Sequence, residues 1–315
     1  PGTTVCRVIR AATSADLDAI ASLSARRHAR LHGAFRELNS ALADPSHVVD
    51  ALPPEPVGWV AEDDGEVTAS LLWERSDARA IAGMIGAVGP PEAMARLYAV
   101  AGDAWLAAGL STHVIVVPSV DRPLADRVVD LSFGREEAYA IRPLGDRGGQ
   151  RLTGAVDIER VGLERVDEIQ RLGDLVARHH EGSPVFDRRS NEFFSGMEES
   201  YRHSVVAQDA RTLLASVDGQ TVGVLMWRPG APFPIYDERS AEMILLAVDP
   251  SVRGRQVGRS LVSAALRDMA SFGHAAAIAD WRTTNLEASR FWPAQGFLTV
   301  AHRYVRTVPA RPDGD

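Results

Sequence analysis

The sequence predicts an α/β protein built from two similar domains, and three observations support this fold class. The 315 residues exceed the roughly 100–200 residues of one typical domain. Hydrophobic residues make up 45% of the chain and charged residues 24%, as in ordinary globular proteins. A glycine-rich segment at residues 143–154, PLGDRGGQRLTG, divides the chain nearly in half, and the same order of strand and helix patterns occurs on both sides of it.

In the first half, apolar patterns predict strands at residues 5–9, 57–61, 67–73, 112–117 and 138–141. Helical spacing predicts helices at residues 15–31, 92–108 and 124–131. Between the second and third strands lies Asp64-Gly65, a dipeptide typical of a two-residue hairpin turn. These elements fill a first domain that we expect at residues 1–145.

The second half repeats this plan. Strands are predicted at residues 155–159, 211–217, 221–227, 242–248, 275–279 and 297–305, and helices at 163–177, 191–203, 258–270 and 286–294. Asp218-Gly219 again predicts a hairpin turn. The continuous apolar run at 242–248 is typical of a buried central strand. We therefore expect a second domain at residues 146–308, followed by a loose polar tail at 309–315.

The composition excludes several kinds of chemistry. All 34 fixed basic side chains are arginines, because the sequence contains no lysine. A lysine Schiff base, a P-loop lysine and a kinase lysine are therefore excluded. The single cysteine, Cys6, excludes disulfides within the chain and metal sites made of several cysteines. We expect no metal site.

The charge balance points to partners and location. The net charge of −8 disfavours a nucleic-acid partner and favours a cationic small molecule. No stretch approaches the ~20 apolar residues of a transmembrane helix, so no membrane partner is expected. Residues 1–10 lack the apolar region of a secretory signal, which predicts a cytoplasmic protein. Either a monomer or a homodimer is compatible with the sequence.

The most informative segment is residues 245–262, LLAVDPSVRGRQVGRSLV. A hydrophobic strand ends at Val248, and a helix opens after Arg253. The first turn of a helix leaves about four backbone N–H groups without helical partners, and together with the helix dipole they attract anions. Gly254 and Gly258 let a diphosphate approach the main chain. The segment therefore predicts a pyrophosphate site that arginines surround.

This segment resembles the acyl-CoA-binding motif of the GNAT acetyltransferase superfamily, [QR]-x-x-G-x-[GA]. The motif here reads RGRQVG from Arg253 to Gly258, and Gln256 stands where the family usually has glycine. The resemblance implies two tandem GNAT-like domains, each with a central twisted mixed β-sheet flanked by helices, and acetyl-CoA as co-substrate. The residues it implies for binding are Leu246, Ala247, Val248, Arg253, Gly254, Arg255, Gln256, Val257, Gly258, Arg259 and Ser260.

A second segment, NLEASRFWPAQGF at residues 285–297, is similar to the family pattern N-x-x-A-x-x-[FL]-Y-x-x-x-G-F. The resemblance implies that Asn285 and the following helix, with Ala288 and Phe291, flank the pantetheine arm. Trp292 occupies the position where many members have a tyrosine that protonates the departing thiolate. Because an indole is no acid at neutral pH, either the thiolate leaves unassisted, another donor serves, or this copy does different work.

Three side chains are candidates for proton transfer. Glu242 begins the predicted central strand, as the base does in the histone-acetylating branch of the family. An isolated carboxylate among apolar residues would have a raised pKa and suit a general base; the alternative is a strand-end glutamate that faces solvent or an arginine. Tyr236 and Tyr304 are possible proton donors or packed aromatics. His179-His180 ends a helix, where a cation suits the dipole.

The first half lacks the pyrophosphate motif. At the corresponding place, residues 87–98 read AVGPPEAMARLY, with a Gly-Pro-Pro break and an acidic Glu92. Farther on, Asp121 stands in the place of asparagine, and Ser132-Phe133 in the place of glycine-phenylalanine. We therefore expect the first domain to be a degenerate GNAT-like copy that does not bind CoA.

The function expected from the resemblance is acetyl transfer from acetyl-CoA to a primary amine of a small molecule, by direct attack in a ternary complex. The acceptors left open include the cysteinyl sugar amine of mycothiol synthesis and aminoglycosides. An alternative of another class is an acyl-CoA-binding sensor or scaffold without catalysis. Aminoacyl or peptidyl transfer in cell-wall synthesis is a further alternative, which the acidic charge disfavours.

Overall fold

The computed structural model describes residues 8–145, 156–187, 191–207 and 210–309. Cys6 and most of the glycine-rich segment lie outside these residues. Two compact units make up the chain: unit 1 comprises Pro1–Tyr139 and Thr299–Asp315, and unit 2 comprises Ala140–Leu298. Unit 1 therefore includes nearly all of the last strand of the chain, which the sequence pattern places in the second domain at residues 146–308.

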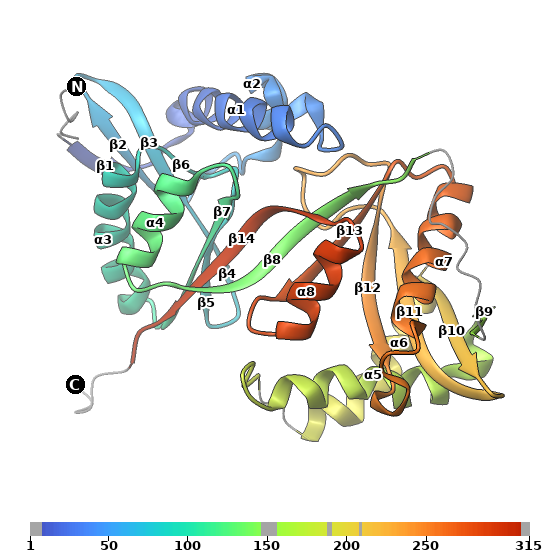
Figure 1. Cartoon of the computed structure of the whole chain (residues 1–315). Coiled ribbons are helices and arrows are strands. Elements are labelled where there is room, and N and C mark those ends of the chain that lie inside the picture. Colours follow the sequence, from blue (N-terminus) through green and yellow to red (C-terminus); the bar gives the residue numbers. More distant parts are fainter. Residues whose placement is uncertain (1–7, 146–155, 188–190, 208–209, 310–315) are drawn as a thin grey trace. The chain divides into compact units, whose positions relative to one another are not determined.

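Unit 1 contains two sheets. The first is antiparallel, with the order β1 (Val8–Ala11), β2 (Gly58–Asp63), β3 (Glu66–Leu72) and β6 (Ala87–Val88). The strands of the second have the order β4 (Glu74–Ser76), β5 (Arg79–Ala82), β7 (Thr112–Pro118), β14 (Leu298–Thr307) and β8 (Gly134–Pro143). β5 and β7 are parallel, whereas β14 is antiparallel to β7 (Figure 1).

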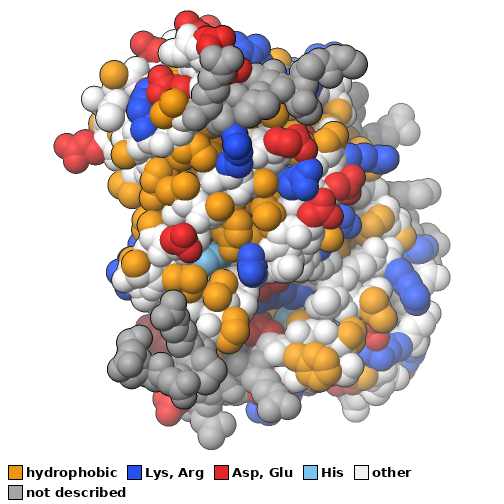
Figure 2. Space-filling view, turned by 90° about the vertical axis from the view of Figure 1, so that its left-hand side faces the viewer, with side chains coloured by type: hydrophobic (Ala, Val, Ile, Leu, Met, Phe, Trp, Pro, Cys, Tyr) orange, Lys and Arg blue, Asp and Glu red, His pale blue; other side chains and the backbone are white. Residues whose placement is uncertain are grey.

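The helices of unit 1 are α1 (Leu17–Ala34), α2 (Pro45–Ala51), α3 (Pro91–Ala107) and α4 (Arg122–Asp130), and β8 (Gly134–Pro143) follows α4. Met94, Leu97 and Trp105 of α3 form one hydrophobic core with strand residues that include Ile115 and Tyr304. Val100 and Leu106 of α3 are exposed to solvent. Figure 2 shows that hydrophobic side chains gather on one face of the molecule.

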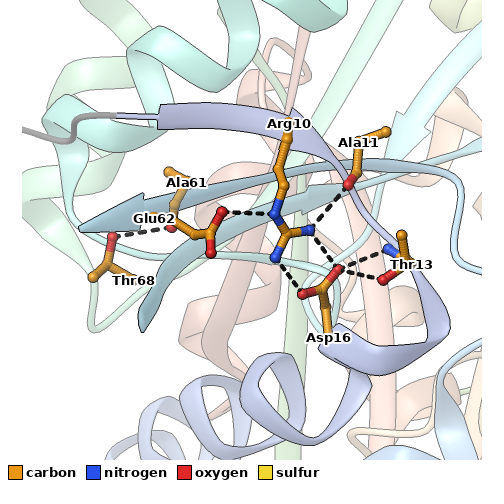
Figure 3. Close-up of polar contacts among 7 residues, drawn as sticks. All are labelled: Arg10, Ala11, Thr13, Asp16, Ala61, Glu62 and Thr68. Carbon is orange, nitrogen blue, oxygen red and sulfur yellow. Dashed lines mark hydrogen bonds and ion pairs between the residues drawn. The ribbon is translucent and has the colours of Figure 1, made fainter. Parts of the chain in front are cut away.

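An ion-pair network fixes the beginning of unit 1 (Figure 3). The guanidinium of Arg10 on β1 donates to Glu62 on β2 at 2.6 Å and to both carboxylate oxygens of Asp16 at 2.7 and 2.8 Å. Asp16 also accepts from the backbone N–H and the hydroxyl of Thr13. The hydrogen bonds from Arg10 are the main reason why the pKa of Asp16 is lowered to about 2. The network joins β1, β2 and the start of α1.

Unit 2 contains five strands of a mixed sheet, in the order β13 (Ala276–Arg282), β12 (Ser240–Val248), β11 (Gln220–Pro229), β10 (Arg211–Val217) and β9 (Asp157–Val161). Only the β12–β13 pair is parallel. The helices are α5 (Val166–Glu181), α6 (Asn191–Ala207), α7 (Val257–Ser271) and α8 (Leu286–Ala294).

Helices cover both faces of this sheet (Figure 1). Val224 and Met226 of β11 pack into one core with Leu172 of α5 and Tyr201 of α6. Gly223, the neighbour of Val224, faces the other way: a Cβ atom there would lie 2.9 Å from the Leu261 side chain of α7. Since neighbouring strand residues point to opposite faces, α7 lies on the face opposite α5 and α6. The mixed sheet flanked by helices confirms the predicted fold class.

The hairpin predictions are confirmed by backbone geometry. Asp64 and Gly65 have φ angles of 50° and 84°, and Asp218 and Gly219 have 52° and 77°. Two successive positive φ angles are those of a type I′ turn, whose twist matches that of the flanking strands. The short elements α2, β4, β5 and β6 did not emerge from the sequence patterns. No helix in the described ranges is long and apolar enough to cross a membrane.

Candidate functional site

The candidate site begins where two parallel strands of unit 2 separate. β12 and β13 pair only from Ser240–Ala276 to Glu242–Ile278. Beyond this point β12 continues to Val248 and β13 to Arg282 without a shared ladder. Ile244, Leu245 and Leu246 are half-buried, although the residues at the start of the strand are buried. The backbone edge of β12 is therefore open to a ligand in its second half.

An irregularity in β12 lies next to this opening. Leu245 pairs with Met226 of β11, but the next partners are Met243 and Trp227, so Ile244 is an extra residue on the β12 side. A bulge of this kind breaks the ladder and increases the local twist. It thus reorients the backbone groups of β12 where the strand leaves β13.

The predicted pyrophosphate motif lies at the start of α7, after β12. Gly254 and Gln256 have positive φ angles of 82° and 63°, and α7 begins at Val257. A methyl group on Gly258 would lie 3.5 Å from the Phe291 ring of α8 and 3.6 Å from Val248 of β12. The end of β12, the first turn of α7 and the Phe291 ring of α8 therefore meet at one place. The exposed side chain of Gln256 stands at the N-cap.

Three arginines surround this turn, and all three are exposed. Arg253 forms an ion pair with Glu287 of α8 at 3.1 Å, and Arg255 forms one with Asp218 of the hairpin, also at 3.1 Å. Arg259 has no ion pair within the described ranges. Exposed pairs of this kind contribute little stability and exchange readily with an anionic ligand. The turn thus combines backbone donors with cationic side chains.

The turn from β13 to α8 is held by the end of α5. Asn285 caps α8 by accepting from the N–H of Ala288 at 3.1 Å, and its Nδ2 donates to Nε2 of His180 at 3.2 Å. Arg282 forms an ion pair with Asp187 at 3.0 Å. Both polar ends of the Asn285 side chain are therefore engaged inside the protein. Sequence reasoning missed that His180 would meet Asn285, since 105 residues separate them.

Glu242 lies at the last paired position of β12 and β13, where the strands begin to separate. Its residue is 7% exposed. Nε of Arg228, from the facing position on β11, donates to the carboxylate at 2.8 Å. The expected isolated carboxylate is thus an ion pair, one of the alternatives left open by the sequence. The Asp218-Gly219 turn predicts only the pairing of β10 with β11. The contact between Arg228 and Glu242 depends on the pairing of β11 with β12, which the turn does not specify.

The three aromatic candidates are buried. Trp292 is 7% exposed and packs edge-on against Phe291 and Phe297, with ring centroids 5.3 and 5.1 Å apart. Tyr236, in the connection from β11 to β12, is 3% exposed. Tyr304 is 1% exposed and belongs to the core of unit 1, so the structure groups it with β7 and α3 rather than with the motif residues of unit 2. Within the described residues, no cluster of three or more metal-ligating side chains occurs.

Comparison with known proteins identifies the type of fold. Residues 177–297 match the acetyltransferase (GNAT) family model. A GCN5-related N-acetyltransferase from Sphaerobacter thermophilus has a similar structure, with a TM-score of 0.60 and 14% identity over 95% of each chain. A tandem GNAT protein from the clavulanic acid biosynthesis pathway has a TM-score of 0.52 and 15% identity over 96% of this chain and 99% of its own. Comparison with curated protein sequences gives no significant match.

Proposed function

Since residues 177–297 match the acetyltransferase (GNAT) family model, we propose that unit 2 transfers an acetyl group from acetyl-CoA to a primary amine of a small molecule. The observation that carries this proposal is the placement of the arginine-glycine turn at the end of β12, just beyond the point where β12 leaves β13. This edge of unit 2 therefore offers N–H donors for an anion at the start of α7. Beside them lie the backbone groups of β12 that do not pair with β13.

The residues at this edge fit the parts of acetyl-CoA. The first-turn N–H groups of α7 suit the diphosphate, with charge from Arg253, Arg255 and Arg259. The half-buried edge of β12 from Ile244 to Val248 offers backbone donors and acceptors to an extended amide-containing arm. When bound, the thioester supplies the activated acetyl group. A strand N–H near Val248 would polarise its carbonyl as an oxyanion-hole donor.

In this proposal the protein holds the thioester and the amine in position and supplies a proton acceptor. Holding thioester and amine side by side can supply ~7–11 kcal/mol of the barrier reduction. Glu242 lies where the strands separate and would accept the proton of the amine, while Arg228 fixes its orientation. Tyr236 is a second candidate for proton transfer, and Tyr304 has no role in the proposal because its ring belongs to the core of unit 1.

The proposal is tested by calorimetry with acetyl-CoA and by a thiol-release assay over a panel of small primary amines. Arg259→Glu reverses a charge at the proposed diphosphate site that has no ion pair among the described residues. We expect it to weaken acetyl-CoA binding by about 10–100-fold, because charge-assisted hydrogen bonds are worth ~1.5–3 kcal/mol. The matched control Arg267→Glu, farther along α7, should bind within about twofold of the parent chain. Undiminished binding by Arg259→Glu would refute the site.

An acyl-CoA-binding sensor without catalysis is the second candidate. The packing of Trp292 between Phe291 and Phe297 favours it, because no acidic hydroxyl occupies that position on α8. Tight acetyl-CoA binding combined with no thiol release for any amine would support the sensor. Thiol release that depends on an amine would support the transferase.

A further inference from the structure

A buried arginine in unit 1 occupies a position that has a counterpart in the site of unit 2. Arg27 on α1 is 4% exposed, and its Nη1 donates to the backbone carbonyl of Ala87 on β6 at 2.5 Å. Burial lowers the pKa of Arg27 to about 10, while the negative charge of Asp121 acts in the opposite direction. The side chain is therefore a cation at neutral pH, bound to β6 and within the field of Asp121.

The two units share a sequence pattern and an order of elements around this arginine. IGAVGP at residues 85–90 aligns with LLAVDP at 245–250 through their shared Ala, Val and Pro, so Ala87 corresponds to Ala247. Asp121 and Asn285 each lie at the N-cap of the helix that follows β7 or β13, three residues beyond the strand. Arg27 is the eleventh residue of α1, and the eleventh residue of α5 is Val176. The guanidinium thus lies between the counterparts of Ala247 and Asn285.

Unit 1 also has the strand separation that opens the site in unit 2. β5 pairs with β7 through Ala82, after which the chain leaves β7, and β6 pairs with β3 instead. The side chains of α1 reach the backbone along this break. Ser24 donates to the carbonyl of Ile85 and Arg27 to that of Ala87. Ser24 and Arg27 correspond to Gly173 and Val176 of α5, which have no side-chain donors.

We infer that Arg27 fills, in unit 1, the place that an acyl-CoA arm takes in unit 2, and that the chain therefore binds acyl-CoA at one site only. The inference rests on the proposed function for the position of the arm. A second feature supports it independently. Eight residues, 249–256, separate β12 from α7, but only Gly89 and Pro90 separate β6 from α3. α3 begins at Pro91, which has no N–H, and Glu92 follows.

The first test needs no variant of unit 1. Calorimetric titration of the full chain with acetyl-CoA should give one site, and Arg259→Glu should weaken that site without revealing a second. Two sites in the parent chain, or a site that Arg259→Glu leaves intact, would overturn the inference. If the parent chain binds no acetyl-CoA at all, the proposed function fails, whereas the role of Arg27 is still decided by the second test.

The second test asks whether Arg27 is what fills the opening. Arg27→Ala removes the side chain, and Arg30→Ala removes an exposed arginine from the same helix as a matched control. Pantetheine, the arm without the nucleotide, is the probe, with unfolding followed by heat. At ten times its Kd, we expect pantetheine to raise the unfolding midpoint of Arg27→Ala by about 2–4 °C more than that of Arg30→Ala or the parent chain. Equal shifts in all three proteins would overturn the role of Arg27.

Discussion

At the scale of single residues, charged groups in this protein act in pairs that join segments distant in sequence. The ion pair of Arg228 and Glu242 links β11 to β12. Arg282 and Asp187 link β13 to the segment after α5. Arg10 and Asp16 link β1 to the start of α1. Because every fixed cation is an arginine, each can donate two hydrogen bonds in a fixed plane. These ion pairs fix the orientation of side chains at the candidate site of unit 2 and at the start of unit 1.

Glu242→Gln tests the proposed base. The amide keeps the size of the side chain but cannot accept the proton of the amine, so we expect kcat to fall by about 10²–10⁴-fold. Calorimetry should show an acetyl-CoA Kd within about twofold of the parent value, because Glu242 does not lie at the α7 turn. Glu238→Gln, an exposed acid in the preceding turn, is the control. An unchanged kcat in Glu242→Gln would remove this residue from the mechanism.

The pair of Arg10 and Asp16 makes the stability of unit 1 depend on pH. The pKa of Asp16 is lowered to about 2 in the folded chain, chiefly by its hydrogen bonds from Arg10, whereas an unfolded aspartate titrates near ~3.9. Folding is therefore stabilised above pH ~4, and this contribution is lost as the pH falls towards 2. After allowance for solvent screening we expect about 1–2 kcal/mol.

Unfolding midpoints measured between pH 6 and pH 2 check this prediction for Asp16. Asp16→Asn should lower the midpoint at pH 6 and flatten its dependence below pH 4. Asp103→Asn is the control, since Asp103 is an exposed carboxylate on α3 of the same unit. A pH profile of Asp16→Asn that parallels the parent profile would contradict the assignment.

At the scale of elements, the backbone is strained in the connection between β12 and α7. Gln256 adopts a left-handed backbone conformation with a φ of 63°, which L-residues with a Cβ disfavour by about 1–2 kcal/mol. Its counterpart in the family motif is glycine, which adopts this conformation without strain. The sequence departure and the backbone strain thus fall on the same residue, at the proposed diphosphate site.

Gln256→Gly should relieve this strain. We expect the free energy of unfolding to rise by about 0.5–1 kcal/mol, because part of the gain is offset by the greater freedom of glycine in the unfolded chain. Chemical denaturation of the parent and variant chains measures the difference. Gln256→Ala is the matched control: it keeps the Cβ atom, so the gain should be absent. Equal gains in both variants would show that the backbone is not the reason.

At the scale of the whole molecule, the last strand of the chain belongs to the unit that is formed by the first half of the sequence. β14 follows the motif helices of unit 2 in sequence but pairs with β7 of unit 1 from Ala301–Pro118 to Thr307–Thr112. Val300 and Ala301 are fully buried, and Tyr304 is 1% exposed. Arg303, on the same strand, forms ion pairs with Glu136 and Glu137 of β8. Unit 1 therefore depends on residues at the far end of the chain.

Tyr304→Ala tests this dependence. Removing a buried aromatic ring costs about 3–5 kcal/mol, so we expect thermal unfolding of unit 1 at a much lower temperature and faster amide hydrogen exchange in β7. Tyr304→Phe should have little effect on either quantity, because the hydroxyl has no hydrogen-bond partner among the described residues. Strong loss of amine-dependent thiol release in Tyr304→Phe would instead restore Tyr304 as a catalytic candidate.

Local sequence patterns predicted most of the elements because the signals are local. Apolar periodicity placed β7, β10, α7 and α8 within a few residues of their observed bounds, and the Asp-Gly dipeptides determined both hairpin turns through their φ angles. The short strands β4, β5 and β6 were missed because four or fewer residues show no clear alternation. Their pairing comes from neighbours, not from their own pattern.

The sequence by itself determined the mixed α/β class, the tandem plan and the arginine-glycine turn at the start of α7, since each depends on residues close together in the chain. Only the tertiary structure decided that Glu242 is paired with Arg228, that Trp292 packs in an aromatic cluster, and that β14 and Tyr304 belong to unit 1. It also brought Arg27 to the carbonyl of Ala87, 60 residues away. The physical reason is that strand pairing and the burial of charge depend on partners remote in sequence, which no local pattern specifies.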